Sequence, residues 1–240
     1  DPIGDLNYVM ETVRITRSEL KDQVPLVGFS GSPWTLATYM IEKKSQDNFH
    51  DIKKLLYEEP STLQRLLDVL AESVAIYLAA QVKAGAQALM IFDTWGGILA
   101  HADFVPFSLL PISSIITHLK SDSKTSEIPI ILFTKAGYPW IIEIAGTGCA
   151  AVSCDWTMSL GKVRKLVENR VAIQGNLDPS VLFAPPEKIR QQIRVVLDDF
   201  GKGNGHVFNL GHGIPPEVNP DHVAILVDSV HQQSRNNKAS

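Results

Sequence analysis

Short, continuous apolar runs recur along this chain, and each ends in a polar or glycine-containing turn. The six runs lie at residues 24–31, 88–97, 129–135, 150–156, 171–178 and 206–213. Runs of this length, bounded by turn signals and followed by helical periodicity, are typical of strands buried on both faces of a parallel sheet. The pattern therefore predicts six parallel strands, whereas a closed barrel of alternating strands and helices needs eight.

Between these runs, apolar residues recur with a helical period. Ser61 and Gln64 have the S-x-x-Q spacing of a capping box, ahead of a long amphipathic helix that is expected to end near Gly85. Gly201 is expected to stop a later helix. Further helices are expected to begin at Pro33, Pro186 and Pro220 and to lie near residues 104–119, 138–147 and 159–168.

The alternation of strand and helix predicts how the chain is organised. No repeat, linker or low-complexity segment interrupts it, so we expect a single α/β domain over residues 1–240 with right-handed helical crossovers. The composition of residues 232–240 indicates a polar, disordered tail. Because the chain opens with Asp1-Pro2 and no initiator methionine, we expect it to be a piece of a longer polypeptide.

The composition of the chain argues against several classes of function. The chain has 240 residues, 45% of them hydrophobic and 20% charged, and a formal net charge of −4, which argues against a nucleic-acid binder. Cys149 and Cys154 are too few for a disulfide framework and poorly spaced for a metal site, so we expect buried, reduced thiols. No continuous apolar run approaches membrane-span length and no signal peptide is evident, which predicts a cytoplasmic protein without membrane contact.

The polar residues that end the predicted strands mark the expected site, because chemistry in such sheets sits at the carboxyl ends of the strands. They are Ser30, Asp93, Thr94, Thr134, Lys135, Asp155, Asn176, Asp178 and His212. Gly96 and Gly97 would let a ligand approach the backbone closely. His212, between two glycines, could donate to an anionic ligand or carry a proton. The pattern predicts an enzyme that binds a polar small molecule.

Each of these residues also has a structural interpretation. Asp178, before a proline, is an N-cap or a catalytic acid. Asp155 either satisfies backbone donors or serves the site. Lys135 would act as a Schiff-base nucleophile only if its amine were desolvated. His212 could instead be a satisfied core histidine.

Four strand-end phrases are more specific than the architecture: residues 28–40, 93–97, 175–179 and 209–213. Together they resemble the uroporphyrinogen decarboxylase family, in the right order and over the whole chain. The resemblance implies a (β/α)8 TIM barrel of which this chain holds the last six βα units. It also implies a cytoplasmic homodimer that removes the four acetate carboxyl groups of uroporphyrinogen to give coproporphyrinogen in haem biosynthesis, without a cofactor or a metal.

By motif, the resemblance makes Tyr39, Thr94 and His212 substrate-binding residues, and we expect them to converge on one cleft. The family's arginine-bearing segment after its first strand, and the aspartate after its second, have no counterpart here. The catalytic residues therefore remain unassigned, and this chain alone is expected to be impaired. The strands at 25–29 and 207–210 are expected to flank a gap left by two missing strands.

Two alternatives stay open beside the decarboxylase. A related group of zinc-dependent corrinoid methyltransferases carries a His-x-Cys at the end of the strand that corresponds to residues 129–135. Here the segment ends in Phe133-Thr134-Lys135, which offers no zinc ligand. The second alternative is an inactive fragment of the decarboxylase.

Overall fold

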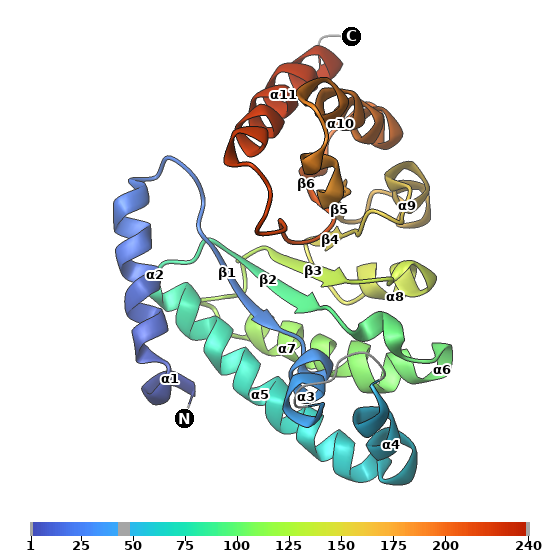
Figure 1. The fold of residues 1–240 in the computed structure, drawn as a ribbon. Helices are drawn as coiled ribbons and strands as arrows, with labels where there is room; N and C mark the ends of the chain where they lie inside the picture. The colour runs from blue at the N-terminus through green and yellow to red at the C-terminus, as the bar shows by residue number, and fades with distance from the viewer. Residues whose placement is uncertain (1, 43–48, 239–240) are drawn as a thin grey trace. The chain divides into compact units, whose positions relative to one another are not determined.

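A computed structural model describes residues 2–42 and 49–238, with the side chains described as far as Ser234 (Figure 1). The chain divides into two compact units. Unit 1 comprises Asp1–Lys135 and Gly146–Ala150, and unit 2 comprises Ala136–Ala145 and Ala151–Ser240. The single domain expected over residues 1–240 therefore stays a prediction, and each unit is described by itself.

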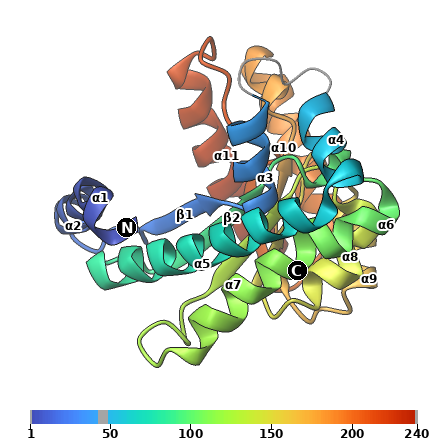
Figure 2. The same ribbon diagram turned by 90° about the horizontal axis from the view of Figure 1, so that it is seen from below.

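Unit 1 contains three of the predicted strands, β1 (Val27–Gly31), β2 (Ala88–Asp93) and β3 (Ile130–Thr134). They are parallel, with β2 paired to both β1 and β3. Its helices are α1 (Pro2–Asp5), α2 (Asn7–Leu20), α3 (Pro33–Ile41), α4 (His50–Glu58), α5 (Pro60–Ala84), η1 (Gly96–Ile98), α6 (His101–Phe104), η2 (Val105–Leu109) and α7 (Leu110–Ser121). Helix α5 runs alongside β1 and β2 and packs against them and against α7 (Figure 1, Figure 2).

The two faces of this three-stranded sheet differ in burial. The side chains of Leu89, Ile91 and Leu132 are fully buried on one face. On the other face Val27 is 41% and Phe29 is 60% exposed. The prediction that every strand is buried on both faces is therefore wrong for β1. Among the described residues of unit 1, β1 is also an edge strand, since it pairs with β2 alone.

The sequence pattern predicts no element over residues 1–23, so helix α2 differs from the expectation. Met10 of α2 is buried against Ala80 and Ala84 of α5, with Tyr77 packed beside them. The small alanine side chains let the two helices approach closely. This contact, rather than a strong local pattern, fixes α2 on unit 1.

The start of α5 differs from the predicted capping box. The helix begins at Pro60 with Glu59 as N-cap residue, and no side chain makes a capping hydrogen bond there. Ser61 therefore lies inside the first turn, because Pro60 is accepted at the first helical position one residue earlier. The predicted end is confirmed, since Gly85 caps the helix with a φ of 121°.

The helical stretch His101–Ser121 is long and apolar enough to cross a membrane by length and composition alone. This qualifies the expectation that no stretch approaches span length. Ile112, Ile115 and Leu119 in this stretch are buried at 0% exposure, whereas Leu110 is 57% exposed, and α7 packs against α5. Core helices pass the same test, so the stretch is weak evidence for a membrane span.

Unit 2 contains the other three predicted strands, β4 (Ala151–Ser153), β5 (Ala172–Leu177) and β6 (His206–Leu210), which are parallel with β5 in the centre. Its helices are η3 (Tyr138–Trp140), α8 (Ile141–Ala145), α9 (Leu160–Leu166), η4 (Pro179–Phe183), α10 (Pro186–Phe200) and α11 (Pro220–Lys238). Apolar residues of β5, β6, α10 and α11, among them Leu177, Ile193 and Leu226, form its core. The predicted stop of α10 at Gly201 is confirmed.

Two expectations for unit 2 are wrong. Residues 232–238 of the expected tail continue helix α11 instead, because the helix is already anchored by apolar residues such as Leu226 and extends past them, whereas residues 239–240 lie outside the described residues. Strand β6 is not buried on both faces, since Val207 is 45% exposed and, among the described residues of unit 2, β6 pairs with β5 alone. With these corrections, all six predicted strands are present.

Candidate active site

Asp93, the last residue of β2, is the centre of a buried hydrogen-bond network in unit 1. Its carboxylate is fully buried. Oδ1 accepts hydrogen bonds from the hydroxyls of Ser32 (2.7 Å) and Thr35 (3.4 Å), and Oδ2 accepts from Ser108 (2.8 Å) and Thr134 (3.3 Å). One carboxylate thus ties together the β1–α3 turn, the end of β3 and the π-helical turn η2.

Burial raises the pKa of Asp93, and the four hydroxyl donors oppose that rise. A Cβ on Gly96 would lie 1.9 Å from Asp93 Oδ2. The space that Gly96 was expected to leave for a ligand is therefore filled by the chain's own carboxylate. Asp93 has no exposed surface through which to meet a substrate, so it acts as a positioning residue for the segment that follows it.

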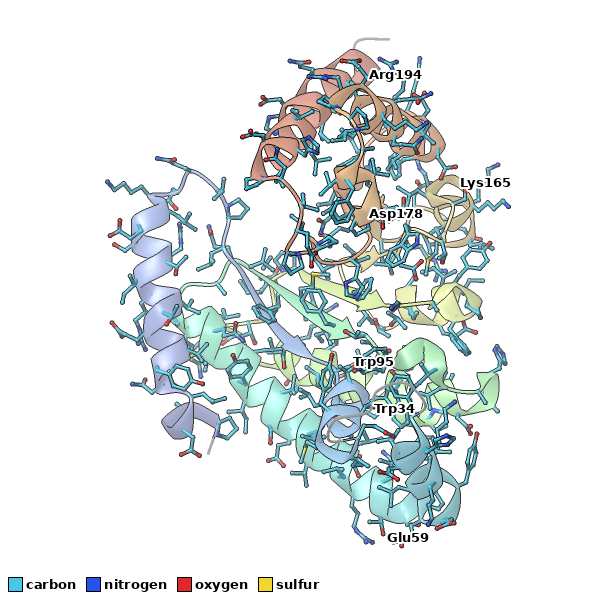
Figure 3. The ribbon with its side chains drawn as sticks, viewed as in Figure 1. Trp34, Glu59, Trp95, Lys165, Asp178 and Arg194 are labelled. Atoms are coloured by element: carbon cyan, nitrogen blue, oxygen red, sulfur yellow. The ribbon has the colours of Figure 1, made fainter. Side chains whose placement is uncertain are left out.

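That segment presents Trp95, around which an aromatic cluster forms. The indole Nε1 of Trp34 on α3 donates to the Trp95 carbonyl over 2.9 Å, and Figure 3 shows the two side chains close together. The Trp95 ring lies 4.8 Å from the Phe49 ring and 6.3 Å from the Tyr39 ring, measured between centroids. The Lys135 ammonium lies 5.7 Å from the Trp95 ring centroid.

Of the three predicted substrate-binding residues, Tyr39 lies in this cluster of unit 1 and Thr94 directly precedes Trp95 in the chain. Tyr39, on α3, is 46% exposed and meets Trp95 edge-on. Thr94 follows β2 directly, between the buried Asp93 and the half-buried Trp95. Thr94 thus lies at the carboxyl end of β2, and Tyr39 lies on the helix that follows β1.

In unit 2, Asp155 and Asn176 organise the turns after β4 and β5. The carboxylate of Asp155 accepts from the backbone N–H of Ala136 (2.6 Å) and of Thr157 (2.8 Å), which supports its interpretation as an acceptor for backbone donors. The Asn176 amide donates to the carbonyls of Asp155 (2.8 Å) and Met158 (2.7 Å). The hydrogen bonds of these two polar side chains hold the turns at the carboxyl ends of β4 and β5 in place.

The structure supports the interpretation of Asp178 as an N-cap residue. Its Oδ1 accepts from the backbone N–H of Ser180 over 2.8 Å, at the start of η4. Figure 3 shows Asp178 in unit 2. The local Asp-Pro-Ser sequence accounts for this capping geometry.

His212, the third predicted substrate-binding residue, is exposed two residues after β6. It is therefore not the core histidine of the competing interpretation. Its Nδ1 accepts the Gly213 N–H over 2.8 Å, so in the neutral ring Nε2 carries the proton. The ring lies 6.3 Å from that of Trp156, edge to face. Whether His212 shares one cleft with Tyr39 and Thr94 of unit 1 stays a prediction.

Within residues 2–42 and 49–238, no group of three or more His, Cys, Asp or Glu side chains could hold a metal ion. Cys149 and Cys154 are both buried, as expected. Burial raises the pKa of the Cys154 thiol to about 12, with the Asp155 charge adding to the effect.

Sequence reasoning missed the partners of these residues. Ser108 and Thr35 gave no signal of their donation to Asp93, because neither residue neighbours it in the chain. The packing of Tyr39 on Trp95 was also missed. The one available signal was the apolar-polar switch at Asp93-Thr94-Trp95, which marked the strand end but not its contacts.

The parallel βα units, with polar and aromatic residues gathered at the strand ends, define an α/β-barrel-type protein. The family model described as uroporphyrinogen decarboxylase (URO-D) matches residues 1–233. The chain belongs to the uroporphyrinogen decarboxylase family.

Curated relatives agree with the family model. The chain is 53% identical over 235 residues to the uroporphyrinogen decarboxylase of Actinobacillus succinogenes and 52% identical over 234 residues to that of Escherichia coli O157:H7. In both cases the match covers 98% of this chain but only 66% of the relative. The chain thus spans slightly less than two thirds of the length of these relatives.

Two solved structures share the fold. A methyltransferase from Methanosarcina mazei has a TM-score of 0.76 at 23% identity, over 94% of this chain and 64% of its own. A B12-independent methionine synthase from Shewanella sp. W3-18-1, in complex with selenomethionine, has a TM-score of 0.64 at 11% identity, over 95% of this chain and 66% of its own. At these identities the likeness concerns the fold alone.

Proposed function

We propose that the protein containing this chain decarboxylates uroporphyrinogen to coproporphyrinogen, as a step of haem biosynthesis. The observation that carries the proposal is the family match over residues 1–233, together with relatives of 52–53% identity that bear this name. The reaction proceeds without a cofactor, in the cytoplasm, in a homodimer that contacts neither nucleic acid nor membrane.

The chemistry needs a proton and an electron sink. Protonation of a pyrrole ring carbon turns the ring into a sink for the electrons of the breaking carbon–carboxyl bond, and carbon dioxide leaves. The exocyclic carbon then takes up a proton to become a methyl group, and the ring carbon gives up the proton that it had gained. Preorganised groups that stabilise the developing cation and bind the substrate carboxylates lower the barrier. Tyr39, Thr94 and His212 bind the substrate, and the Nε2–H of His212 is a donor suited to a carboxylate.

The 240 residues alone catalyse this reaction poorly. The family pattern supplies arginines and an aspartate from a part of the barrel that has no counterpart in this sequence, and the match covers only 66% of the relatives. Loss of one preorganised group aimed at transition-state charge costs about 100- to 1000-fold, and here more than one is missing.

The test compares two proteins under anaerobic conditions. One is the 240-residue chain, and the other is the same chain joined to the amino-terminal third of the A. succinogenes relative. Chromatography of the oxidised products should show coproporphyrin from the chimera and mainly uroporphyrin from the chain alone. Equal turnover by both would contradict the proposed impairment, and a folded chimera without turnover would contradict the function.

The role of His212 is tested in the chimera. His212→Ala should raise the Michaelis constant or lower turnover while the melting temperature stays close to that of the parent, since His212 is exposed. His231→Ala, an exposed histidine on α11, is the matched control and should change neither. A parallel loss of melting temperature and activity in His212→Ala would assign the residue to folding instead.

A further inference from the structure

Lys135 is a cation at the end of β3 in unit 1. Its backbone N–H donates to the Asp93 carbonyl over 3.3 Å, which anchors it beside the end of β2. Its side chain is half-buried, and its Nζ lies 5.7 Å from the centroid of the Trp95 ring. Among the residues that the structure describes, no carboxylate pairs with this ammonium and no acceptor hydrogen-bonds to it. It is held by the face of an aromatic ring instead.

Trp95 is itself held in place from several sides. Its carbonyl accepts the Trp34 indole N–H, and its backbone N–H donates to Thr35 Oγ1 over 3.3 Å. Its ring packs against Phe49 and meets Tyr39 edge-on. A fixed ring reduces the freedom that the long lysine side chain would lose on binding a ligand.

We propose that Lys135 binds a carboxylate of the tetrapyrrole substrate, with Trp95 as the positioning residue that holds its ammonium at the carboxyl end of the sheet. The assignment rests on the proposed function, which supplies an anionic substrate. A cation–π contact leaves the three N–H donors of the ammonium available to an anion, as an ion pair with a protein carboxylate would not. Tyr39, a predicted substrate-binding residue, lies against the same ring.

The experiment measures binding of uroporphyrin, the stable oxidised form of the substrate, to the chimera described above by fluorescence titration. Lys135→Met should weaken binding about 10-fold or more, as loss of a charge-assisted hydrogen bond predicts, whereas Lys135→Arg keeps the charge and should retain most of the affinity. Trp95→Leu should weaken binding about 3- to 10-fold, and Trp95→Phe, which keeps a ring, should weaken it less. Lys165→Met, an exposed lysine on α9, is the matched control and should change nothing.

The salt dependence of the affinity distinguishes a direct charge interaction of Lys135 from a structural effect of its substitution. Raising the salt concentration should weaken uroporphyrin binding more in the parent than in Lys135→Met, because the substituted protein has lost the screened interaction. A tetracationic porphyrin should bind the parent no better than it binds Lys135→Met. If Lys135→Met binds uroporphyrin as tightly as the parent, the assignment is overturned while the proposed function stands. If the folded parent chimera does not bind uroporphyrin, the proposed function fails and the assignment with it.

Discussion

Replacing Asp93 with asparagine tests whether the buried network holds the strand ends of unit 1. The amide keeps one acceptor oxygen and converts the other to a donor, so two of the four hydroxyl donors lose their partner. Hydrogen bonds to a charged group contribute about 1.5–3 kcal/mol each, so the loss is about 3–6 kcal/mol. Removal of a buried charge offsets part of it, which leaves a net destabilisation of about 2 kcal/mol.

The pH dependence of this substitution has a definite sign. Burial raises the pKa of Asp93 above its ordinary value of 3.8, which the unfolded chain retains. As the pH falls through the raised pKa towards 3.8, the folded parent takes up a proton before the unfolded chain does. That uptake stabilises the parent and is absent in Asp93→Asn, so the difference in unfolding free energy should widen towards acid.

Urea unfolding of the 240-residue chain at pH 7 and near pH 5 measures both effects. At pH 7 the expected 2 kcal/mol corresponds to a fall in melting temperature of about 4–8 °C for a chain of this size. Asp68→Asn is the control, since Asp68 is an exposed carboxylate on α5 that pairs with Gln64. Equal stability of Asp93→Asn and the parent at pH 7 would refute the positioning role given to Asp93.

Three further predictions follow from single residues. Gly96→Ala should lower the unfolding free energy by about 3 kcal/mol or more, because its Cβ would lie 1.9 Å from Asp93 Oδ2. Gly213→Ala is the control and should change the unfolding free energy by no more than about 0.5 kcal/mol, because its Cβ would have nothing within 4 Å. Equal costs of the two substitutions would contradict the close contact. Burial lowers the pKa of His206, an effect partly opposed by its bond to the Gly175 carbonyl, so it contributes stability above pH 6.5 that is lost as the pH falls towards the lowered pKa. The unfolding free energy of His206→Phe should lack that loss, and a parallel pH profile would contradict it. Cys154, with its pKa raised to about 12, should react with iodoacetamide at pH 8 only after unfolding, and rapid labelling of the native protein, seen by mass spectrometry, would count against its burial.

The strand pattern could be predicted from the sequence because its signals are local. Each of the six apolar runs contains one of the observed strands, and Gly85 and Gly201 end their helices as expected. Asp178 could be narrowed to two roles for the same reason, since an Asp-Pro-Ser sequence carries its own capping geometry. Local chemistry is what a single sequence displays most directly.

The contacts within the site could not be predicted, because they join distant parts of the chain. Asp93 collects donors from Ser32, Ser108 and Thr134, which only the tertiary structure brings together. Helix α2 depends on packing against α5 rather than on its own pattern. The exposure of Phe29 likewise depends on which strand neighbours β1, and that is a property of the sheet rather than of the strand.

The most direct test of the account uses uroporphyrinogen labelled with carbon isotope in the acetate carboxyl groups, incubated anaerobically with the chimera described above. The account predicts that the label leaves as carbon dioxide in step with the appearance of coproporphyrinogen, and that label placed in the propionate carboxyl groups stays with the tetrapyrrole. Retention of the acetate label by a chimera that is folded and binds uroporphyrin would contradict the assignment of this chain to a uroporphyrinogen-decarboxylating protein.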